Sequence, residues 1–173
     1  MKKKLYHLCS SIAFATFIFI AFGSGDDKKS NSITENVAKS ISVGQTLQTD
    51  YFEVTVNKVS FEERISTGNQ FADLKRENGS LYLVLNVTFK NTDAESRMLT
   101  DGEILINYNG KDYLFDKSET IMLEGWGVLL DQINPLTSKT TNLVYKIPTE
   151  IKGNLFYRPG RAGSDDLISL GKI

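Results

Sequence analysis

The stretch that decides the fold reads Leu81-Tyr82-Leu83-Val84-Leu85-Asn86-Val87-Thr88-Phe89. Every odd position in it is apolar, while Asn86, Thr88 and the following Lys90 share the even face. This period of two is typical of a strand with one face in a core, because a helix would spread the same side chains around its axis. Turn-forming residues precede the stretch at Asn78-Gly79 and follow it at Asn91-Thr92-Asp93. We therefore expect a central strand of an antiparallel β-protein.

A second alternating segment lies before this strand. Phe52, Val54 and Val56 alternate with polar residues, and Val59 and Phe61 continue the pattern on the other parity. A slip of one residue would turn the second half of a regular strand toward solvent. We therefore predict a β-bulge near Asn57-Lys58 that keeps all five apolar side chains inward.

The pair Asn109-Gly110 predicts a β-hairpin between strands at 104–108 and 111–115, since both residues tolerate the positive φ angles of a type I′ turn. Phe71 and Leu74, three residues apart in the irregular stretch 62–79, predict one or two helical turns. We expect an edge strand around Gly44 and further strands at 120–123, 128–133, 140–147, 154–157 and 167–170. Many short strands separated by turns indicate an all-β antiparallel β-sandwich.

The N-terminal residues have the pattern of a signal peptide. Lys2-Lys3-Lys4 precede an apolar run over 12–22, and Ala21-Phe22-Gly23 offers small residues to a signal peptidase. We predict a signal peptide over 1–23, a disordered polar linker over 24–40 and one sandwich domain over 41–173. The expected location is extracellular or at the cell surface; an uncleaved membrane-anchored envelope protein is the alternative.

Removal of residues 1–23 would change the chemistry that the chain can perform. It leaves 17 basic residues against 21 acidic ones, which gives no basic surface for nucleic acid. It also removes His7 and Cys9, the single histidine and the single cysteine of the chain. Serine and cysteine proteases with a histidine base and zinc sites of the usual ligand types are thereby excluded. Ser24 stands where a lipid-anchored protein would carry cysteine, so we expect no stable lipid anchor.

Carboxylates supply the remaining candidates for catalysis or metal binding. Asn91, Asp93 and Glu95 alternate like the first ligands of a calcium loop, but Ser96 replaces the glycine that such a loop requires. We expect no metal and no other cofactor. The segments Asp101-Gly102-Glu103 and Asp165-Asp166 could each supply half of an acid–base pair, so an extracellular hydrolase that uses two carboxylates is an alternative function.

Trp126 is the candidate binding residue, because glycines flank it in Glu124-Gly125-Trp126-Gly127. One interpretation is an exposed aromatic anchor for a partner, since tryptophan is enriched at binding hot spots. The other is a tryptophan folded back over an open edge of the sandwich, with its indole N–H bonded locally. The expected function is a non-catalytic binding or interaction module, with an unknown protein or envelope component as partner.

The order of these segments resembles a family of exported bacterial domains of unknown function. The matching residues include Val43-Gly44-Gln45, Leu83-x-Leu85-x-Val87-x-Phe89-x-Asn91 and Leu143-Val144-Tyr145-Lys146-Ile147-Pro148, within residues 41–157. The resemblance implies an immunoglobulin-like sandwich, similar to the immunoprotective extracellular antigens, and it carries no catalytic residues. The chain departs from the family at Ser24, where most members have a lipidated cysteine, and at Leu136, where glycine is more frequent.

Overall fold

The computed structural model describes residues 40–160 and 166–173. The predicted signal peptide and nearly all of the predicted linker therefore lie outside the described residues. Within the described part the secondary structure consists of strands and turns, with no helix that could cross a membrane.

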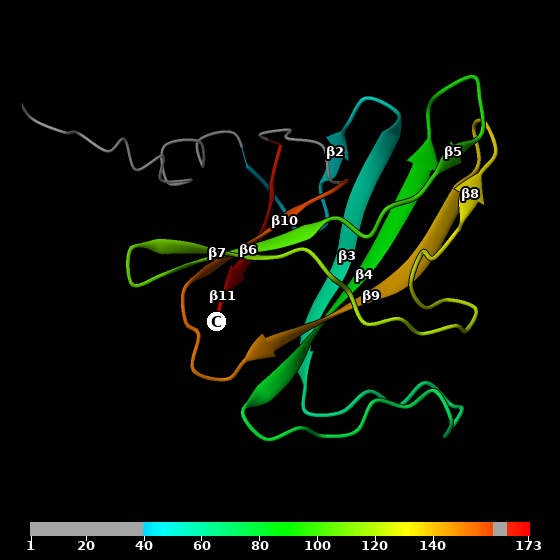
Figure 1. The fold of residues 1–173 in the computed structure, drawn as a ribbon. Coiled ribbons are helices and arrows are strands. Elements are labelled where there is room, and N and C mark those ends of the chain that lie inside the picture. Colours follow the sequence, from blue (N-terminus) through cyan, green and yellow to red (C-terminus); the bar gives the residue numbers. More distant parts are fainter. Residues whose placement is uncertain (1–39, 161–165) are drawn as a thin grey trace, which may run out of the picture. The chain divides into compact units, whose positions relative to one another are not determined.

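Eleven strands form the described part of the chain, and they divide mainly between two sheets (Figure 1). The four-stranded sheet has the order β2-β3-β4-β9, with β2 Thr46–Gln48, β3 Phe52–Glu62, β4 Ser80–Asn91 and β9 Ser138–Pro148. The five-stranded sheet has the order β1-β11-β10-β6-β7, with β1 Ile41–Ser42, β11 Ile168–Lys172, β10 Asn154–Arg158, β6 Glu103–Tyr108 and β7 Lys111–Phe115. A small third pair joins β5 Arg97–Met98 to β8 Gln132–Ile133. All pairs are antiparallel except β1 with β11.

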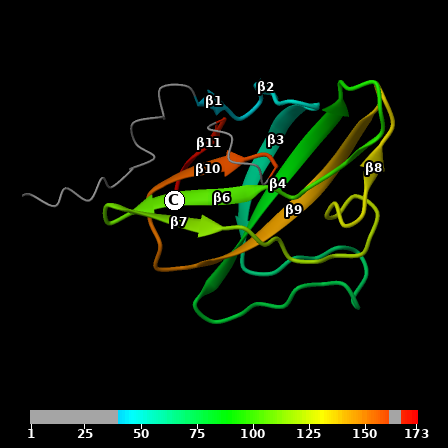
Figure 2. The same ribbon diagram turned by 45° about the horizontal axis from the view of Figure 1, so that its top comes forward.

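The strand predicted to be central is β4, which lies between β3 and β9 over its whole length. Leu83, Leu85 and Val87 are fully buried, as the period of two requires. They face side chains of the other sheet, including Ile104, Ile106, Leu155 and Ile168, in one apolar core. Figure 2 shows β6, β7 and β10 in a layer beside that of β3, β4 and β9. The prediction of an all-β antiparallel sandwich is confirmed.

The β-bulge in β3 is also confirmed. The pairing of β3 with β4 shifts between Val56 and Lys58, so the extra residue is Asn57. Asn57 and Lys58 are both exposed, while Val54 and Val56 remain buried in the core. The register also agrees with the predicted direction of Val59 and Phe61, which pair with the buried Leu85 and Leu83, although Phe61 remains 39% exposed.

The predicted hairpin at 104–115 is confirmed, since Asn109 and Gly110 join β6 to β7 with φ angles of 51° and 72°. These two positive angles match a type I′ turn. Leu136, at the position where the resembling family more often has glycine, adopts a φ of 60° with its side chain exposed. Leucine therefore takes a backbone conformation that glycine adopts without strain.

The prediction of helical turns in 62–79 is wrong. An antiparallel bridge instead pairs Ile65 with Leu74, and the Asp73 carboxylate accepts hydrogen bonds from the N–H and hydroxyl of Thr67. Phe71 at the tip is 90% exposed, so it was not a core residue of a helix. The predicted strands at 120–123 and 128–133 are also wrong, apart from the two residues of β8, because this segment bonds as a loop along the edge of β9.

Part of the even face of β4, which the sequence suggested to be polar and exposed, is covered by apolar side chains. Tyr82 is buried and Val84 is half-buried, because Ile65 from the loop 62–79 and Ile121 from the loop 116–131 pack over them. Together with Val144 these residues form a second apolar cluster outside the sandwich core. The outer face of the four-stranded sheet is therefore covered near Tyr82 and open near Thr88.

One backbone carbonyl ties the two sheets together. The hydroxyls of Tyr145 on β9 and Tyr157 on β10 both donate to the carbonyl oxygen of Asp101. The Tyr157 hydroxyl lies 3.0 Å from that oxygen, and its side chain is fully buried. Burial raises the pKa of the Tyr157 phenol far above its ordinary value, and the nearby Asp101 raises it further.

We predict that this phenol makes the domain sensitive to alkali. In the unfolded chain Tyr157 would release its proton near pH ~10, while the folded chain retains it. The stabilisation is therefore present below that pH and is lost above it, by up to about 1.4 kcal/mol per pH unit. In urea unfolding across this pH range, the free energy of unfolding should fall less steeply with pH in Tyr157→Phe than in the wild type. In Tyr113→Phe, which changes an exposed side chain, it should fall as steeply as in the wild type. Equal slopes in all three proteins would contradict the prediction.

Candidate functional site

Trp126 is held in place by its backbone. Gly125 and Gly127 have φ angles of 80° and 68°, which explains the glycine on each side. The Asn142 N–H donates to the Gly125 carbonyl and the Gly127 N–H donates to the Asn142 carbonyl, both at 2.9 Å. Trp126 thus forms a parallel bridge with Asn142 and extends the four-stranded sheet beyond β9. The tryptophan is presented from a fixed segment.

The Trp126 side chain is half-buried and lies against the second apolar cluster, beside Val84. Its indole N–H has no hydrogen-bond partner among the described residues. Neither of the two interpretations from sequence matches this arrangement fully. The side chain packs in part on the protein, as in a folded-back tryptophan, while its N–H has no partner among the described residues, as in an anchor.

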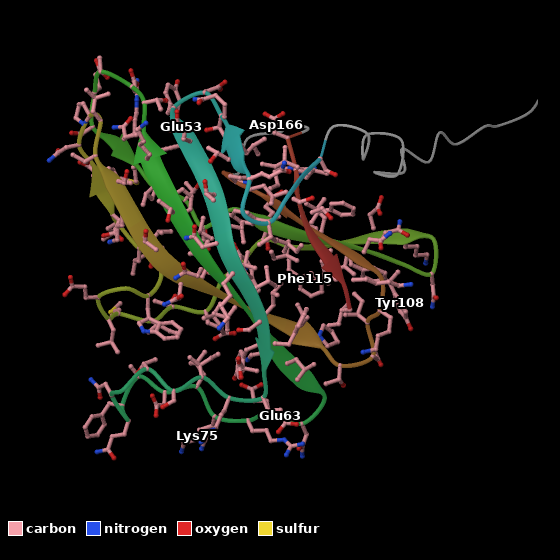
Figure 3. All side chains as sticks on the ribbon, turned by 180° about the vertical axis from the view of Figure 1, so that it is seen from behind. Glu53, Glu63, Lys75, Tyr108, Phe115 and Asp166 are labelled. Carbon is pink, nitrogen blue, oxygen red and sulfur yellow. The ribbon has the colours of Figure 1, made fainter. Side chains whose placement is uncertain are left out.

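Trp126 lines an open cleft of about 660 Å³ on the outer face of the four-stranded sheet. We call it the Trp126 cleft. Its other lining residues include Ser60, Arg64, Ile65 and Val84. They come from the end of β3, from the middle of β4 and from the loop that follows β3. Figure 3 labels Glu63 in this loop and Glu53 near the opposite end of β3.

Charged groups stand at the rim of the Trp126 cleft. Glu63 pairs with Arg76 at 3.3 Å, and both side chains are largely exposed. Arg64 has no ion pair or hydrogen bond with any residue in the described ranges. The cleft therefore offers a half-buried aromatic ring, an apolar floor and an unpaired guanidinium, which together suit a ligand with both apolar and polar faces.

The structure places the predicted calcium-like residues in a closed turn. Asn91 is buried, and its amide donates to the carbonyl oxygens of Glu95 and Ile133 at 2.7 and 2.9 Å. Asp93 accepts a hydrogen bond from Arg97, which holds the pKa of this carboxyl below its ordinary value. The hydrogen bonds of Asn91 and Asp93 thus hold the turn that follows β4. The described residues contain no cluster of three potential metal ligands.

Two of the carboxylates considered for acid–base chemistry, Asp101 and Glu103, have hydrogen-bond or ion-pair partners of their own. Asp101 accepts hydrogen bonds from the N–H and hydroxyl of Ser118, whereas Glu103 pairs with Arg158 at 3.1 Å. Asp166 is described, but Asp165, the other carboxylate of this pair, lies outside the described residues.

The sequence identified Trp126 but not its surroundings. Ser60 lies near the end of β3 and Arg64 in the loop that follows, in a stretch without a recognisable motif, and only the fold brings both to the cleft beside Trp126. The paired glycines were the one local signal, because they marked a backbone that needs positive φ angles.

Comparison with known proteins supports the fold. The family model described as Domain of unknown function (DUF4352) matches residues 41–167. An uncharacterized β-sandwich protein of Clostridium difficile 630 is similar in structure, with 19% identity and a TM-score of 0.54 over 76% of this chain and 94% of that one. A conserved hypothetical protein of Bacillus anthracis matches with 21% identity and a TM-score of 0.47, over 69% of this chain and 89% of that one. A candidate lipoprotein of Bacillus subtilis matches with 18% identity and a TM-score of 0.46, over 74% of this chain and 38% of that one. No curated protein matches. The immunoglobulin-like topology and the likeness to antigens stay predictions.

Proposed function

The chain belongs to the family of domains of unknown function DUF4352, and from the geometry of its own surface we propose that it is a non-catalytic binding module of an exported protein. The Trp126 cleft is its binding site. The partner is a component of the cell envelope, and the domain meets it outside the cell membrane.

The position of Trp126 is the observation that supports this proposal. A tryptophan packed on one side and free at its N–H provides apolar contact area together with a hydrogen-bond donor. Such residues commonly supply most of the free energy of binding when they stand at the centre of a contact. The fixed backbone at Gly125 and Gly127 lowers the entropy that would be lost on binding, because the ring needs little rearrangement.

The open shape of the Trp126 cleft also favours binding over catalysis. Its carboxylates are Glu62 and Glu63, adjacent in the chain, and Glu63 is neutralised by Arg76. A glycosidase would need two carboxyl groups facing each other across the substrate. Arg64 can instead donate several hydrogen bonds to a bound ligand without taking part in proton transfer.

We predict that Trp126→Ala strongly weakens binding to envelope fragments from the producing cell. A loss of about 2 kcal/mol or more, roughly thirtyfold in affinity, is expected for a central tryptophan. Co-sedimentation of the exported chain with washed envelope fragments measures this. Trp126 is the single tryptophan of the chain, so its fluorescence should also change when fragments are added to the wild type.

The control for this experiment is Tyr113→Ala, which removes an exposed aromatic side chain from β7 of the other sheet. It should bind as the wild type does. Arg64→Ala should bind more weakly than the wild type but more tightly than Trp126→Ala. Sedimentation of Trp126→Ala equal to that of the wild type would contradict the proposed function.

A further inference from the structure

A row of amides crosses the open part of the four-stranded sheet. The Asn57 amide donates to Asn86 at 2.9 Å, and the Asn86 amide donates to Asn142 at 2.9 Å. The Asn142 amide then donates to the Gly125 carbonyl at 3.0 Å. Each amide keeps further donor or acceptor capacity after these bonds. The row is thus ordered by its own contacts while it still offers hydrogen bonds to solvent.

A row of threonines lies beside the amides on the same face. Thr55, Thr88 and Thr140 are paired in register across β3, β4 and β9. The hydroxyls of Thr88 and Thr140 are 2.8 Å apart, and the Asn57 amide also donates to Thr88 at 2.9 Å. We call these six residues the polar platform: Asn57, Asn86, Asn142, Thr55, Thr88 and Thr140. All six are exposed or half-buried.

The bulge in β3 keeps a second polar residue beside Asn57 on the outer face. In a regular strand Asn57 would follow the buried Val56 on the outer face, and Lys58 would then face the core, because successive residues face opposite sides. The extra residue at this point leaves both Asn57 and Lys58 on the outer face. The bulge therefore places the exposed Lys58 next to the first amide of the row.

The polar platform continues into the Trp126 cleft. Asn142 pairs with Trp126 across the edge of β9, so the tryptophan stands at the end of the amide row. Val84, two residues from Asn86 on the same face of β4, lines the cleft. The amide row spans two gaps between strands, or roughly 10 Å. Amides, hydroxyls and an aromatic ring therefore form one continuous surface.

We infer that the polar platform and the Trp126 cleft together bind an uncharged glycan chain. This inference rests on the proposed function of the cleft and names its ligand. Amides and hydroxyls both donate and accept hydrogen bonds, as sugar hydroxyls do. The indole ring offers its apolar face to the C–H side of a sugar ring. The span of the amide row is about the length of two linked sugar rings.

The charges around the polar platform favour an uncharged ligand. Its six side chains carry no charge, and the neighbouring Lys90 is paired with Glu53 at 2.9 Å. Lys58 is the cation next to the amide row, and Arg64 stands in the cleft. A polyanion would need several cations along its length, since each phosphate or carboxylate left unpaired would weaken its binding.

The test measures retention of the exported chain on chitin, on cellulose and on cell walls of the producing cell stripped of protein and lipid. We expect retention on at least one of these glycans, and we expect it to persist at about 0.5 M NaCl, where charge attraction is strongly screened. Asn57→Ala should weaken binding by roughly threefold to tenfold, the range for removing one hydrogen-bonding group. Lys58→Ala should bind as the wild type does.

Asn107→Ala is the matched control. Asn107 also makes a side-chain hydrogen bond between neighbouring strands, to Asp112, but both residues are on the five-stranded sheet, away from the polar platform. It should retain wild-type binding, and thermal unfolding should show that both asparagine variants are folded. No retention on any of the three glycans, or retention that about 0.5 M NaCl abolishes, would overturn the inference. Binding to whole envelope fragments that depends on Trp126, without glycan retention, would leave the proposed function standing and refute the glycan ligand.

Discussion

Replacing Leu85 by alanine is expected to lower the free energy of unfolding by roughly 2–5 kcal/mol, the range for emptying a buried leucine site. Leu85 is fully buried at the middle of β4, with β3 and β9 paired on its two sides. Its side chain belongs to the core between the two sheets, so truncation leaves a cavity that neither sheet can close without losing its own pairing.

The matched variant is Thr88→Ala, three residues away on the outer face. The substitution removes the hydroxyl contact with Thr140, but Asn57 keeps its hydrogen bond to Asn86. We therefore expect the free energy of unfolding to change by no more than about 1 kcal/mol. Urea unfolding at neutral pH measures both variants. Equal losses at the two positions would mean that β4 does not have one core face and one open face.

The sequence predicted those parts of the fold in which local chemistry and tertiary structure agree. The alternation in β4 reflects one buried face, and the Asn109-Gly110 turn needs only its own two residues. The bulge near Asn57 was predictable for the same reason, because the apolar parity changes within one continuous strand.

The outer cover of the four-stranded sheet could not be predicted in this way. Tyr82 reads as a member of the polar face, and only the loops that carry Ile65 and Ile121 make it a core residue. Spacing in the stretch 62–79 suggested helical turns, whereas Ile65 and Leu74 form a bridge and pack in one cluster with Tyr82 of the sheet. Contacts between distant segments overrode the local pattern.

The candidate site follows the same rule. Trp126 was identifiable because its glycines are neighbours in the chain. The amide row was not, since Asn57, Asn86 and Asn142 are aligned only by the register of three strands. A sequence shows that each is an asparagine on a strand, but the hydrogen bonds among them require the pairing to be known.

Gly102→Ala is expected to destabilise the domain by about 2–5 kcal/mol, which combines two separate costs. Gly102 has a φ of 75°, and a side chain in this conformation costs roughly 1–2 kcal/mol. A Cβ there would also lie 2.5 Å from the Arg158 carbonyl oxygen and 2.8 Å from the Tyr157 ring. Overpacking of this kind adds about 1–3 kcal/mol, because the neighbouring atoms belong to the backbone and to a buried ring.

Gly79→Ala separates the two costs, since Gly79 has nearly the same φ, 79°, and a Cβ there meets nothing within 4 Å. It should lose only the conformational part, roughly 1–2 kcal/mol. The difference between the two variants in urea unfolding then measures how tightly Gly102 is packed against Arg158 and Tyr157. A difference near zero would mean that the segment before β6 moves away from β10 without cost, and that the close approach at Gly102 does not hold these two strands of one sheet together.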